Sequence, residues 1–566
     1  MNPFESLSDK QKEIVFEKEG KFVVRACPGS GKTYSVAARF ARLLKDWKFS
    51  HQGIAVISFT NVAWQEIESY LHNIFNIHTP IQHPHFLGTI DSFINNHIFL
   101  PFGHLMLGCD RRPILVGEPH GVWSGRYFSD SFFDKISFDL NGGIIAQNPR
   151  EMPRNWQSNS YIIGAKNRLL KAGYANQSDA NYFSKKILEE FAGISKSLAL
   201  KFPFLIVDEA QDTSEIQMNI IDHLISLGLS EVMLVGDYDQ AIFEWNEAKP
   251  ELLKSKYEEW KDNSLVLNDN WRSSQLICDF TFPLSSLEEA SKAVNDEVSH
   301  FTTMPKIVVN ENIEETINKF LEDCRANGVE ISRDKVAVLC RSQSFLNEIV
   351  GSQNIDYRNQ PWEVGKNYAK QFALGKYLID NYNINDGYKL IEKAVYKAKF
   401  NKNYCSRENI KNLIEKYGII NFRSDIYRLV QVLPDTDDKN LNWWIEHTNT
   451  NFESRNIPIE LEVNQKKGNV SFDDLFKTAK ETPSDLNYRV GTVHSVKGET
   501  LDAVLLFLKK RGVGKYYKTF LREGASTNDN EELRIVYVAI TRPRKILTMA
   551  VPDKQNLEAW SKKLFE

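Results

Sequence analysis

The stretch ACPGSGKT, from Ala26 to Thr33, lies between a short apolar run, Lys21 to Ala26, and a helical stretch that begins at Tyr34. Its glycines let backbone N–H groups approach a phosphate chain, and the following helix directs the positive end of its dipole there. Strand, glycine-rich turn, Gly-Lys-Thr and helix together form a phosphate-binding loop, here with alanine in place of the usual first glycine. The pattern predicts nucleotide binding by Ala26, Cys27, Pro28, Gly29, Ser30, Gly31, Lys32 and Thr33.

Two acidic residues follow a second apolar run, FLIV, from Phe204 to Val207. In an ATPase with such a loop, Lys32 contacts the β and γ phosphates and the Thr33 hydroxyl contacts Mg²⁺. Asp208 would be the second Mg²⁺ ligand, and Glu209 would orient the attacking water. We therefore predict ATP and Mg²⁺ as the cofactors. The long separation between Lys32 and Asp208 also predicts an insertion between them.

Short apolar runs alternate with helical stretches along most of the chain. This alternation is typical of parallel sheets covered by helices, and it predicts an α/β fold. A first set of strands is expected at 21–26, 54–58, 204–207, 232–236 and 264–267, and a second set at 335–340, 503–508 and 546–551.

The composition is that of a folded, multi-domain protein. The chain has 566 residues, 42% of them hydrophobic, and a formal net charge of −4. A DNA partner would therefore need a local basic groove, because the whole molecule does not attract polyanions. Six cysteines without C-x-x-C spacing favour a reducing compartment. Since no apolar run reaches membrane-spanning length, we expect a cytoplasmic protein.

Seven further strings appear in a characteristic order: LSDKQKEIV, AVISFTNVAWQEI, GTIDSF, VGDYDQAIFEW, NDNWRSS, GTVHSVKGE and ELRIVYVAITRPR. With the two acidic residues and the phosphate-binding loop, they resemble the motifs of superfamily 1A DNA helicases, the UvrD/Rep/PcrA group. The resemblance implies two RecA-like P-loop NTPase domains, each with a largely helical insertion. It places the first core at 1–100 and 196–266, its insertion at 101–195, the second core at 267–352 and 483–566, and its insertion at 353–482.

The resemblance also implies roles for single residues. Gln11 would recognise adenine, Gln240 would lie near the γ-phosphate, and Glu499 would contact the ribose. Arg272 and Arg542 would act as arginine fingers from the second core. Because these arginines reach the phosphate only when the cores close, hydrolysis would be coupled to domain movement.

Single-stranded DNA contacts are implied for a further set of residues, namely Phe59, Thr60, Asn61, Thr89, Phe243, Trp245 and His494. Aromatic side chains can stack on bases of any sequence, although Phe59 and Trp245 are also interpretable as core residues. His494 is also interpretable as a residue that orients the surface between the domains.

Four positions depart from the family pattern. Asp91 stands where a histidine is common, and Tyr34 replaces an arginine after the P-loop threonine. The third motif continues as Trp245-Asn246-Glu247 instead of Trp-Arg-Gly, and Glu499 directly follows Gly498.

Two functional hypotheses follow from these patterns. The first is a motor enzyme that uses ATP to translocate on single-stranded or tailed DNA, with the 3′ to 5′ direction that the family implies. The second is a DNA- or nucleotide-sensing ATPase subunit that regulates a nuclease and unwinds little by itself. The short insertions, with GTIDSF followed closely by LPF, resemble the helicase-like subunit of bacterial Gabija anti-phage systems.

That resemblance implies a separate nuclease subunit, a GajA-like endonuclease. Since the chain ends soon after Arg542, we expect any nuclease to be another chain. A P-loop kinase or GTPase is disfavoured, because neither combines DEAQD with a downstream TRPR.

Overall fold

The computed structural model describes residues 3–121, 123, 127–148, 152–242, 249–350, 361–362, 368–381, 384–400, 402, 405, 407–437, 439–476, 486–509, 521 and 525–565. These residues form two compact units. Unit 1 comprises 1–116, 132–349 and 484–566, and unit 2 comprises 117–131 and 350–483.

Unit 1 contains a six-stranded sheet in which every neighbouring pair is parallel. In spatial order the strands are β10 (Leu265–Leu267), β1 (Lys21–Ala26), β9 (Glu231–Gly236), β8 (Phe204–Val207), β2 (Ile54–Ser58) and β3 (Phe86–Thr89). Because all strands run the same way, their carboxyl ends meet at one edge, where the P-loop and the two acidic residues emerge.

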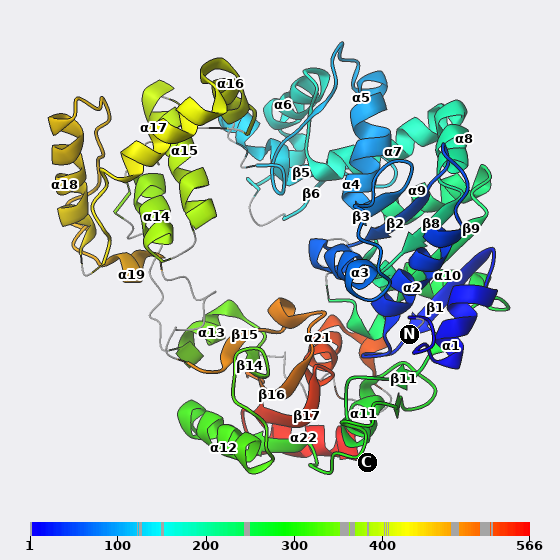
Figure 1. Ribbon diagram of the computed structural model, residues 1–566. Helices are drawn as coiled ribbons and strands as arrows, with labels where there is room; N and C mark the ends of the chain where they lie inside the picture. The colour runs from blue at the N-terminus through cyan, green and yellow to red at the C-terminus, as the bar shows by residue number, and fades with distance from the viewer. Residues whose placement is uncertain are drawn as a thin grey trace. The chain divides into compact units, whose positions relative to one another are not determined.

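Helices cover both faces of this sheet (Figure 1). Successive strand residues point to opposite faces, so Phe22 and Val24 of β1 enter one core while Val23 enters the other. The hydrophobic core on the face of Phe22 and Val24 is completed by α2 (Lys32–Asp46) and α3 (Asn61–Asn73). The hydrophobic core on the face of Val23 is completed by α4 (Ile90–Ile94), α7 (Gln177–Glu190), α8 (Ala192–Lys201), α9 (Glu215–Ser226) and α10 (Pro250–Glu259).

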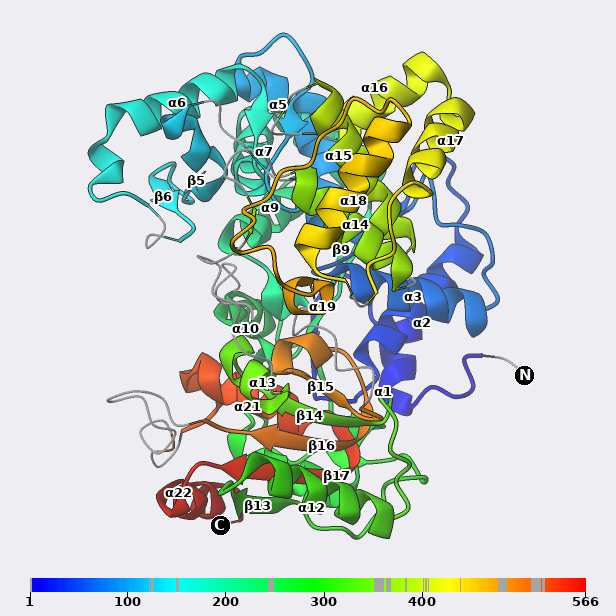
Figure 2. The same ribbon diagram turned by 90° about the vertical axis from the view of Figure 1, so that its left-hand side faces the viewer.

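A second, five-stranded parallel sheet lies in the same unit. Its order is β13 (Lys306–Val309), β17 (Pro543–Val551), β16 (Leu501–Phe507), β14 (Val336–Cys340) and β15 (Arg489–Thr492), and Figure 2 shows β14, β16 and β17 side by side. One face packs against α11 (Gln275–Thr281), α21 (Glu531–Ile540) and α22 (Lys554–Phe565). Further elements are α12 (Ile313–Ala326), α13 (Gln343–Val350) and the short pair β11 (Asp269–Asn270) and β12 (Lys292–Ala293).

The segment between β3 and β8 mixes helices with short strands. Its elements in unit 1 are α5 (Leu100–Leu107), β4 (Ile114–Leu115), β5 (Ile136–Phe138), β6 (Ile144–Ala146), α6 (Ser160–Lys171) and β7 (Tyr174–Ala175), followed by α7 and α8. A buried ion pair joins three of them. Lys166 of α6 donates to Asp179 of α7 over 2.6 Å and to the carbonyl of Ile136 in β5 over 2.5 Å.

Unit 2 is built around its own apolar core. Its helices are α14 (Tyr368–Asp380), α15 (Ile384–Phe400), α16 (Arg407–Tyr417), α17 (Ile419–Val430), α18 (Leu441–Ser454) and α19 (Phe472–Phe476). Trp444, Phe372 and Phe452 are fully buried in this core. Unit 2 therefore has a hydrophobic core independent of unit 1.

The α/β fold class, with parallel sheets flanked by helices, is confirmed. The domain limits drawn from the sequence stay a prediction. In the part of the chain that the structure describes, no helix is both long and apolar enough to span a bilayer.

Replacing Lys166 tests the buried ion pair. Lys166→Met leaves the Asp179 carboxylate buried without its counter-ion, and we expect the free energy of unfolding to fall by about 3–5 kcal/mol. Urea denaturation measures this change. Lys186→Met is the matched control on α7, because the Lys186–Glu189 pair is partly exposed; we expect a loss below about 1 kcal/mol. Equal losses in the two variants would contradict the prediction.

Candidate nucleotide site

Two glycines shape the loop between β1 and α2. Gly29 has φ 75° and Gly31 has φ 74°, backbone angles that residues other than glycine rarely adopt. A Cβ on Gly29 would also lie 2.6 Å from the Cβ of Arg272, and one on Gly31 would lie 2.9 Å from Nε2 of Gln11. The loop thus needs glycine for its backbone conformation and for the close approach of its neighbours. Its amides and the start of α2 form an anion site.

Asn270 of β11, which follows the first sheet in the chain, holds this loop in place. Nδ2 of Asn270 donates to the carbonyl of Pro28 over 2.9 Å, and its Oδ1 accepts from the backbone N–H groups of Arg272 and Ser273, each over 2.8 Å. The N–H of Trp271 also donates to the carbonyl of Gly29 over 2.8 Å. One side chain therefore couples the P-loop backbone to the position of Arg272.

Gln11 lies beneath the P-loop and is 2% exposed. Its Oε1 accepts from the N–H of Ser8 over 3.0 Å, which completes a capping box at α1 (Asp9–Lys12), and its Nε2 donates to the carbonyl of Ser30 over 3.4 Å. The structure thus places Gln11 against the loop backbone. Adenine recognition by this residue stays a prediction.

A cavity of about 340 Å³ opens over the P-loop. Its wall combines residues of both sheets: Cys27, Gly29, Ser30, Gly31, Lys32, Thr33, Tyr34, Glu66, Tyr70, Glu209, Gln240, Trp271, Arg272, Asn295, Gly498, Thr500, Arg542 and Arg544. The remaining predicted loop residues, Ala26 and Pro28, lie at the end of β1 and in the loop backbone. The cavity therefore joins the P-loop to the arginines predicted from the second core.

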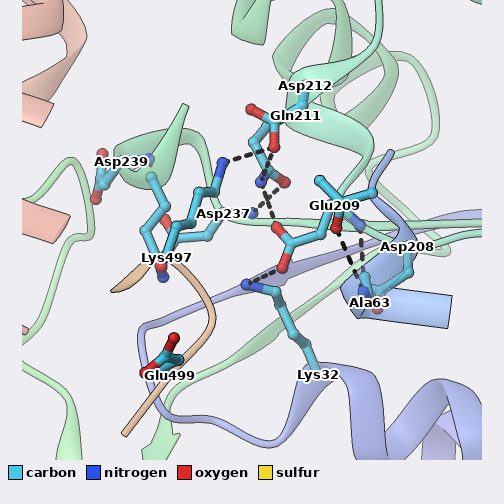
Figure 3. A network of polar contacts seen from close by, with 12 residues as sticks. Lys32, Ala63, Asp208, Glu209, Gln211, Asp212, Asp237, Asp239, Lys497 and Glu499 are labelled. Carbon is cyan, nitrogen blue, oxygen red and sulfur yellow. Dashed lines mark hydrogen bonds and ion pairs between the residues drawn. The ribbon is translucent and has the colours of Figure 1, made fainter. Parts of the chain in front are cut away.

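Lys32 points from α2 to the carboxylate of Glu209, and Nζ lies 3.0 Å from Oε1 (Figure 3). Burial opposes the charge of Lys32, yet Glu209 and Asp237 outweigh burial and raise the pKa of Lys32. Burial alone would raise the pKa of Glu209, but Lys32 and Lys497 lower it to about 2. Without nucleotide, the lysine and the glutamate therefore neutralise each other.

Asp208 is fully buried at the end of β8. Burial and the charge of Glu209 raise the pKa of Asp208 to about 7, although Lys32 and the Thr33 hydroxyl oppose the shift. Oδ1 accepts from the N–H of Glu209 over 3.0 Å, whereas Oδ2 has no hydrogen-bond partner among the described residues. A buried carboxylate oxygen left unpaired beside a hydroxyl is a donor set that suits Mg²⁺. Thr33 and Asp208 thus fit the predicted metal.

Behind Glu209, the side chain of Gln211 connects three elements. Its Nε2 donates to Glu209 over 2.5 Å and to Asp212 over 3.3 Å, while its Oε1 accepts from the N–H of Asp237 at the end of β9 (Figure 3). Lys497, which follows β15, forms an ion pair with Asp212 over 2.6 Å. The second core therefore delivers a cation to the acidic cluster.

Gln240 and Arg542 form the most direct link between the cores at the cavity. Nε2 of Gln240 donates to Asp237 over 2.5 Å, and its Oε1 accepts from the guanidinium of Arg542. Arg542 is 1% exposed, and burial together with the like charge of Arg272 lowers its pKa to about 9. Arg272 donates from Nε to the Thr500 hydroxyl over 3.0 Å. Both arginines thus lie at the cavity wall, and their role as arginine fingers stays a prediction.

Three aromatic side chains, Tyr34, Tyr70 and Trp271, contribute to the cavity wall. Tyr34 and Tyr70 meet edge to face at 5.4 Å, and the Tyr70 hydroxyl donates to Glu66 over 3.0 Å. Trp271 is 39% exposed and belongs to the same wall. Such a wall suits the flat face of a nucleotide base.

Glu499 lies beside the cavity. Its neighbours Gly498 and Thr500 belong to the wall, whereas its carboxylate accepts from Arg489 of β15 over 2.5 Å. Its predicted ribose contact stays a prediction.

The predicted DNA residues divide into three groups. Thr60 and Thr89 cap α3 and α4 at the carboxyl ends of the paired strands β2 and β3, and Asn61 is exposed beside Thr60. Phe59 is half-buried before Thr60, and His494 follows β15, where it bonds to the backbone of Ile242. Phe243 and Trp245 lie outside the described residues.

Several site residues were missed by sequence reasoning. Asn270, Gln211, Asp237 and Lys497 all lie inside quoted motif strings, but no spacing rule singles them out. Glu66 and Tyr70 lie one helical turn apart on α3, a pattern that any amphipathic helix produces. Their roles become visible only when the fold brings the elements together.

The fold and the cavity define a P-loop NTPase site completed by a second α/β core. The family model of the UvrD/REP helicase N-terminal domain matches residues 7–100 and 143–261. These residues therefore carry the N-terminal domain of UvrD-like helicases, in agreement with the motif resemblance. The match supports a DNA helicase as the general class of the protein.

Individual relatives agree with this assignment. The chain is 24% identical to Gabija protein GajB of Bacillus cereus over 552 residues, which cover 96% of this chain and 95% of that protein. It is 22% identical to ATP-dependent DNA helicase PcrA of Staphylococcus aureus over 630 residues, with 96% and 82% covered. DNA helicase II of Haemophilus influenzae is 27% identical over 292 residues, with 48% and 39% covered.

Removing the Asn270 side chain tests whether its hydrogen bonds stabilise the P-loop. Asn270→Ala frees the Pro28 carbonyl and the Arg272 N–H, and we expect nucleotide affinity to fall by about tenfold, since a lost buried hydrogen bond costs about 1–3 kcal/mol. Fluorescent nucleotide titration measures the affinity. Asn268→Ala is the matched control, because Asn268 bonds instead to the carbonyl of Ala290. A control that weakens binding as much as Asn270→Ala would refute the role.

Proposed function

We propose that this chain is a cytoplasmic, DNA-stimulated ATPase that translocates 3′ to 5′ on single-stranded or tailed DNA. The observation that carries the proposal is the Gln240–Arg542 contact, which joins motif residues of the two cores at the wall of the P-loop cavity. A site completed from two cores is sensitive to their relative position, and hydrolysis can therefore be coupled to movement.

The proposed chemistry begins with an exchange of partners at Lys32. The phosphates of ATP would compete with Glu209 for the ammonium group, and Glu209 would then be free to orient a water molecule. While Glu209 is paired with Lys32 and lies near Lys497, its pKa of about 2 keeps the carboxylate ionised. Thr33 and Asp208 would hold Mg²⁺, which supplies charge neutralisation at the β and γ phosphates when bound.

Arg272 and Arg542 would stabilise the charge that develops on the transferred phosphoryl group. Arg542 is already fixed by its contacts to Gln240 and to the carbonyl of Val538 over 3.0 Å. A buried guanidinium held by several acceptors loses little freedom when it meets a phosphate. We infer that these two arginines are the fingers of the site.

The DNA strand is proposed to cross the carboxyl edge of the first sheet. Thr60, Asn61 and Thr89 lie together there because Ser58 of β2 pairs with Thr89 of β3. The starts of α3 and α4 at this edge offer N–H donors to the phosphate backbone. Phe59 and His494 would add a stacking ring and a contact from the second core.

A second candidate function is an ATPase subunit that regulates a nuclease. The similarity to GajB along nearly the whole of both chains favours it. In this case the partner would be a separate, GajA-like endonuclease, and the role would be anti-phage defence. Both functions use the same ATP site and are compatible.

ATP turnover with and without DNA tests the proposal directly. We expect single-stranded DNA to stimulate hydrolysis, and the protein to displace a strand from a 3′-tailed duplex in preference to a 5′-tailed one. Lys32→Ala should abolish turnover, because the phosphates lose their cation. Arg542→Ala should lower stimulated turnover by about 10³-fold and retain ATP binding.

Arg455→Ala is the matched control for loss of an arginine. Arg455 directly follows α18 in unit 2, and its guanidinium bonds locally to Asn451 and Ser454. Equal turnover with and without DNA, together with no strand displacement, would refute the motor. Stable co-purification with an adjacent-gene nuclease would support the second function, and a monomer indifferent to that nuclease would contradict it.

A further inference from the structure

A ladder of polar side chains crosses unit 1 from α4 to α9. We call it the polar ladder; its members are Asn95, Gln177, Asn181, Asp91, Gln217 and Ser214. Asn95 donates to Gln177 over 2.9 Å, Gln177 to Asn181 over 3.1 Å, and Asn181 to Asp91 over 3.2 Å. Gln217 then donates to Asp91 over 2.9 Å and accepts from the N–H of Ser214 over 3.0 Å. The ladder ends where α9 begins.

Asp91 sets the direction of the hydrogen bonds around it. Its Oδ1 accepts from Nδ2 of Asn181 and from Nε2 of Gln217. Because an ionised carboxylate only accepts, both amides must turn their NH₂ groups toward it. The carbonyl of Gln217 is thereby aimed at Ser214. A histidine at position 91, common in the family pattern, cannot accept from two amides in this way.

Asp91 lies next to the carboxyl edge of the first sheet, where DNA is proposed to bind. It is the second residue of α4, which starts at the end of β3, and Thr89 caps this helix by accepting from the N–H of Ser92 over 3.1 Å. A strand that engages Thr89 therefore acts on a short helix whose first turn contains Asp91.

Gln217 is connected through Ser214 to the segment that carries Asp208 and Glu209. Ser214 caps α9 and follows the short turn Ala210–Asp212, which continues directly from Asp208 and Glu209. Gln217 is 4% exposed and Ser214 is 9% exposed. Asp91 itself is half-buried, so a displacement of Asp91 takes a charged acceptor away from a nearly buried amide, which weakens the fixed orientation of Gln217.

The elements that carry the ladder lie side by side. α4 and α7 are in contact, and α7 is in contact with α9 (Figure 1). Within the polar ladder, Gln217 connects α4 to the start of α9: its Nε2 donates to Asp91 and its Oε1 accepts from the N–H of Ser214. A shift of α4 is transmitted there through directed hydrogen bonds, partly buried at Asp91 and buried at Ser214.

We propose that the Asp91–Gln217 contact couples strand binding at α4 to the position of Asp208 and Glu209. Asp91 and Gln217 are then positioning residues for DNA-stimulated hydrolysis, and neither touches the nucleotide. The inference rests on the proposed function, since it explains how DNA reaches the ATPase site.

A polarity-reversal experiment tests the contact. Gln217→Glu sets a carboxylate against Asp91, and Asp91→Asn replaces an acceptor-only carboxylate with an amide that can either accept or donate, so the direction of the Gln217 contact is no longer imposed. The double variant Asp91→Asn/Gln217→Glu restores one donor and one acceptor, and the new carboxylate can still accept from the Ser214 N–H. Each variant is assayed as the full chain for the ratio of ATP turnover with saturating single-stranded DNA to turnover without DNA.

We expect Gln217→Glu to lower this ratio by about tenfold. The double variant should recover to within about threefold of the wild type. Nucleotide-free DNA affinity, measured by fluorescence anisotropy, should stay unchanged in all variants. Thermal midpoints identify any variant that fails to fold.

Glu215→Gln is the matched control on α9. Like Asp91→Asn, it removes one carboxylate charge, here from an exposed ion pair with Lys249 outside the polar ladder. This variant should keep the wild-type ratio. If DNA stimulates the wild type and Gln217→Glu equally, the inference is wrong and the proposed function still stands. The same holds if DNA stimulates the wild type but the folded double variant shows no recovery. If DNA does not stimulate the wild type, the proposed function fails and the inference falls with it.

Discussion

The ion pair between Lys32 and Glu209 is the interaction on which the site depends. Asp208, Glu209 and Asp237 are all placed near this one lysine, in surroundings that exclude most water. Buried carboxylates without counter-charges are costly, and a single lysine cannot neutralise three of them. Burial, together with the neighbouring carboxylates Glu209 and Asp239, raises the pKa values of Asp208 and Asp237, each to about 7, although Lys32 opposes both shifts. The site is therefore ready for further cations.

The second core supplies those cations. Lys497 reaches Asp212, Arg542 reaches Gln240, and Arg272 lies at the cavity wall. Each is separated from the P-loop by hundreds of residues, so each arrives only when the cores are adjacent. Charge balance in the first core thus favours contact with the second, and a nucleotide polyphosphate changes that balance.

The turn Tyr238–Gln240 is where the second core holds the first most firmly. Asp239 accepts from Ser285 over 2.7 Å and from Thr527 over 2.5 Å, and Arg534 donates to the carbonyl of Ala241 over 2.8 Å. Gln240 lies between these contacts and Arg542. Movement between the cores therefore acts on Gln240 first, which links the geometry of the phosphate end to the relative position of the cores.

The sequence by itself determined the α/β class, the P-loop and most central strands, because buried parallel strands are continuous apolar runs. FLIV at Phe204–Val207 coincides with β8, whereas β3 and β13 were not predicted: both are edge strands that are only partly buried. The motif order also indicated which arginines belong to the site. Only the tertiary structure decided what Gln11, Asn270, Lys497 and Asp91 touch. Their partners are backbone carbonyls, buried amides and distant acids, and such contacts depend on directions in space that no local spacing encodes.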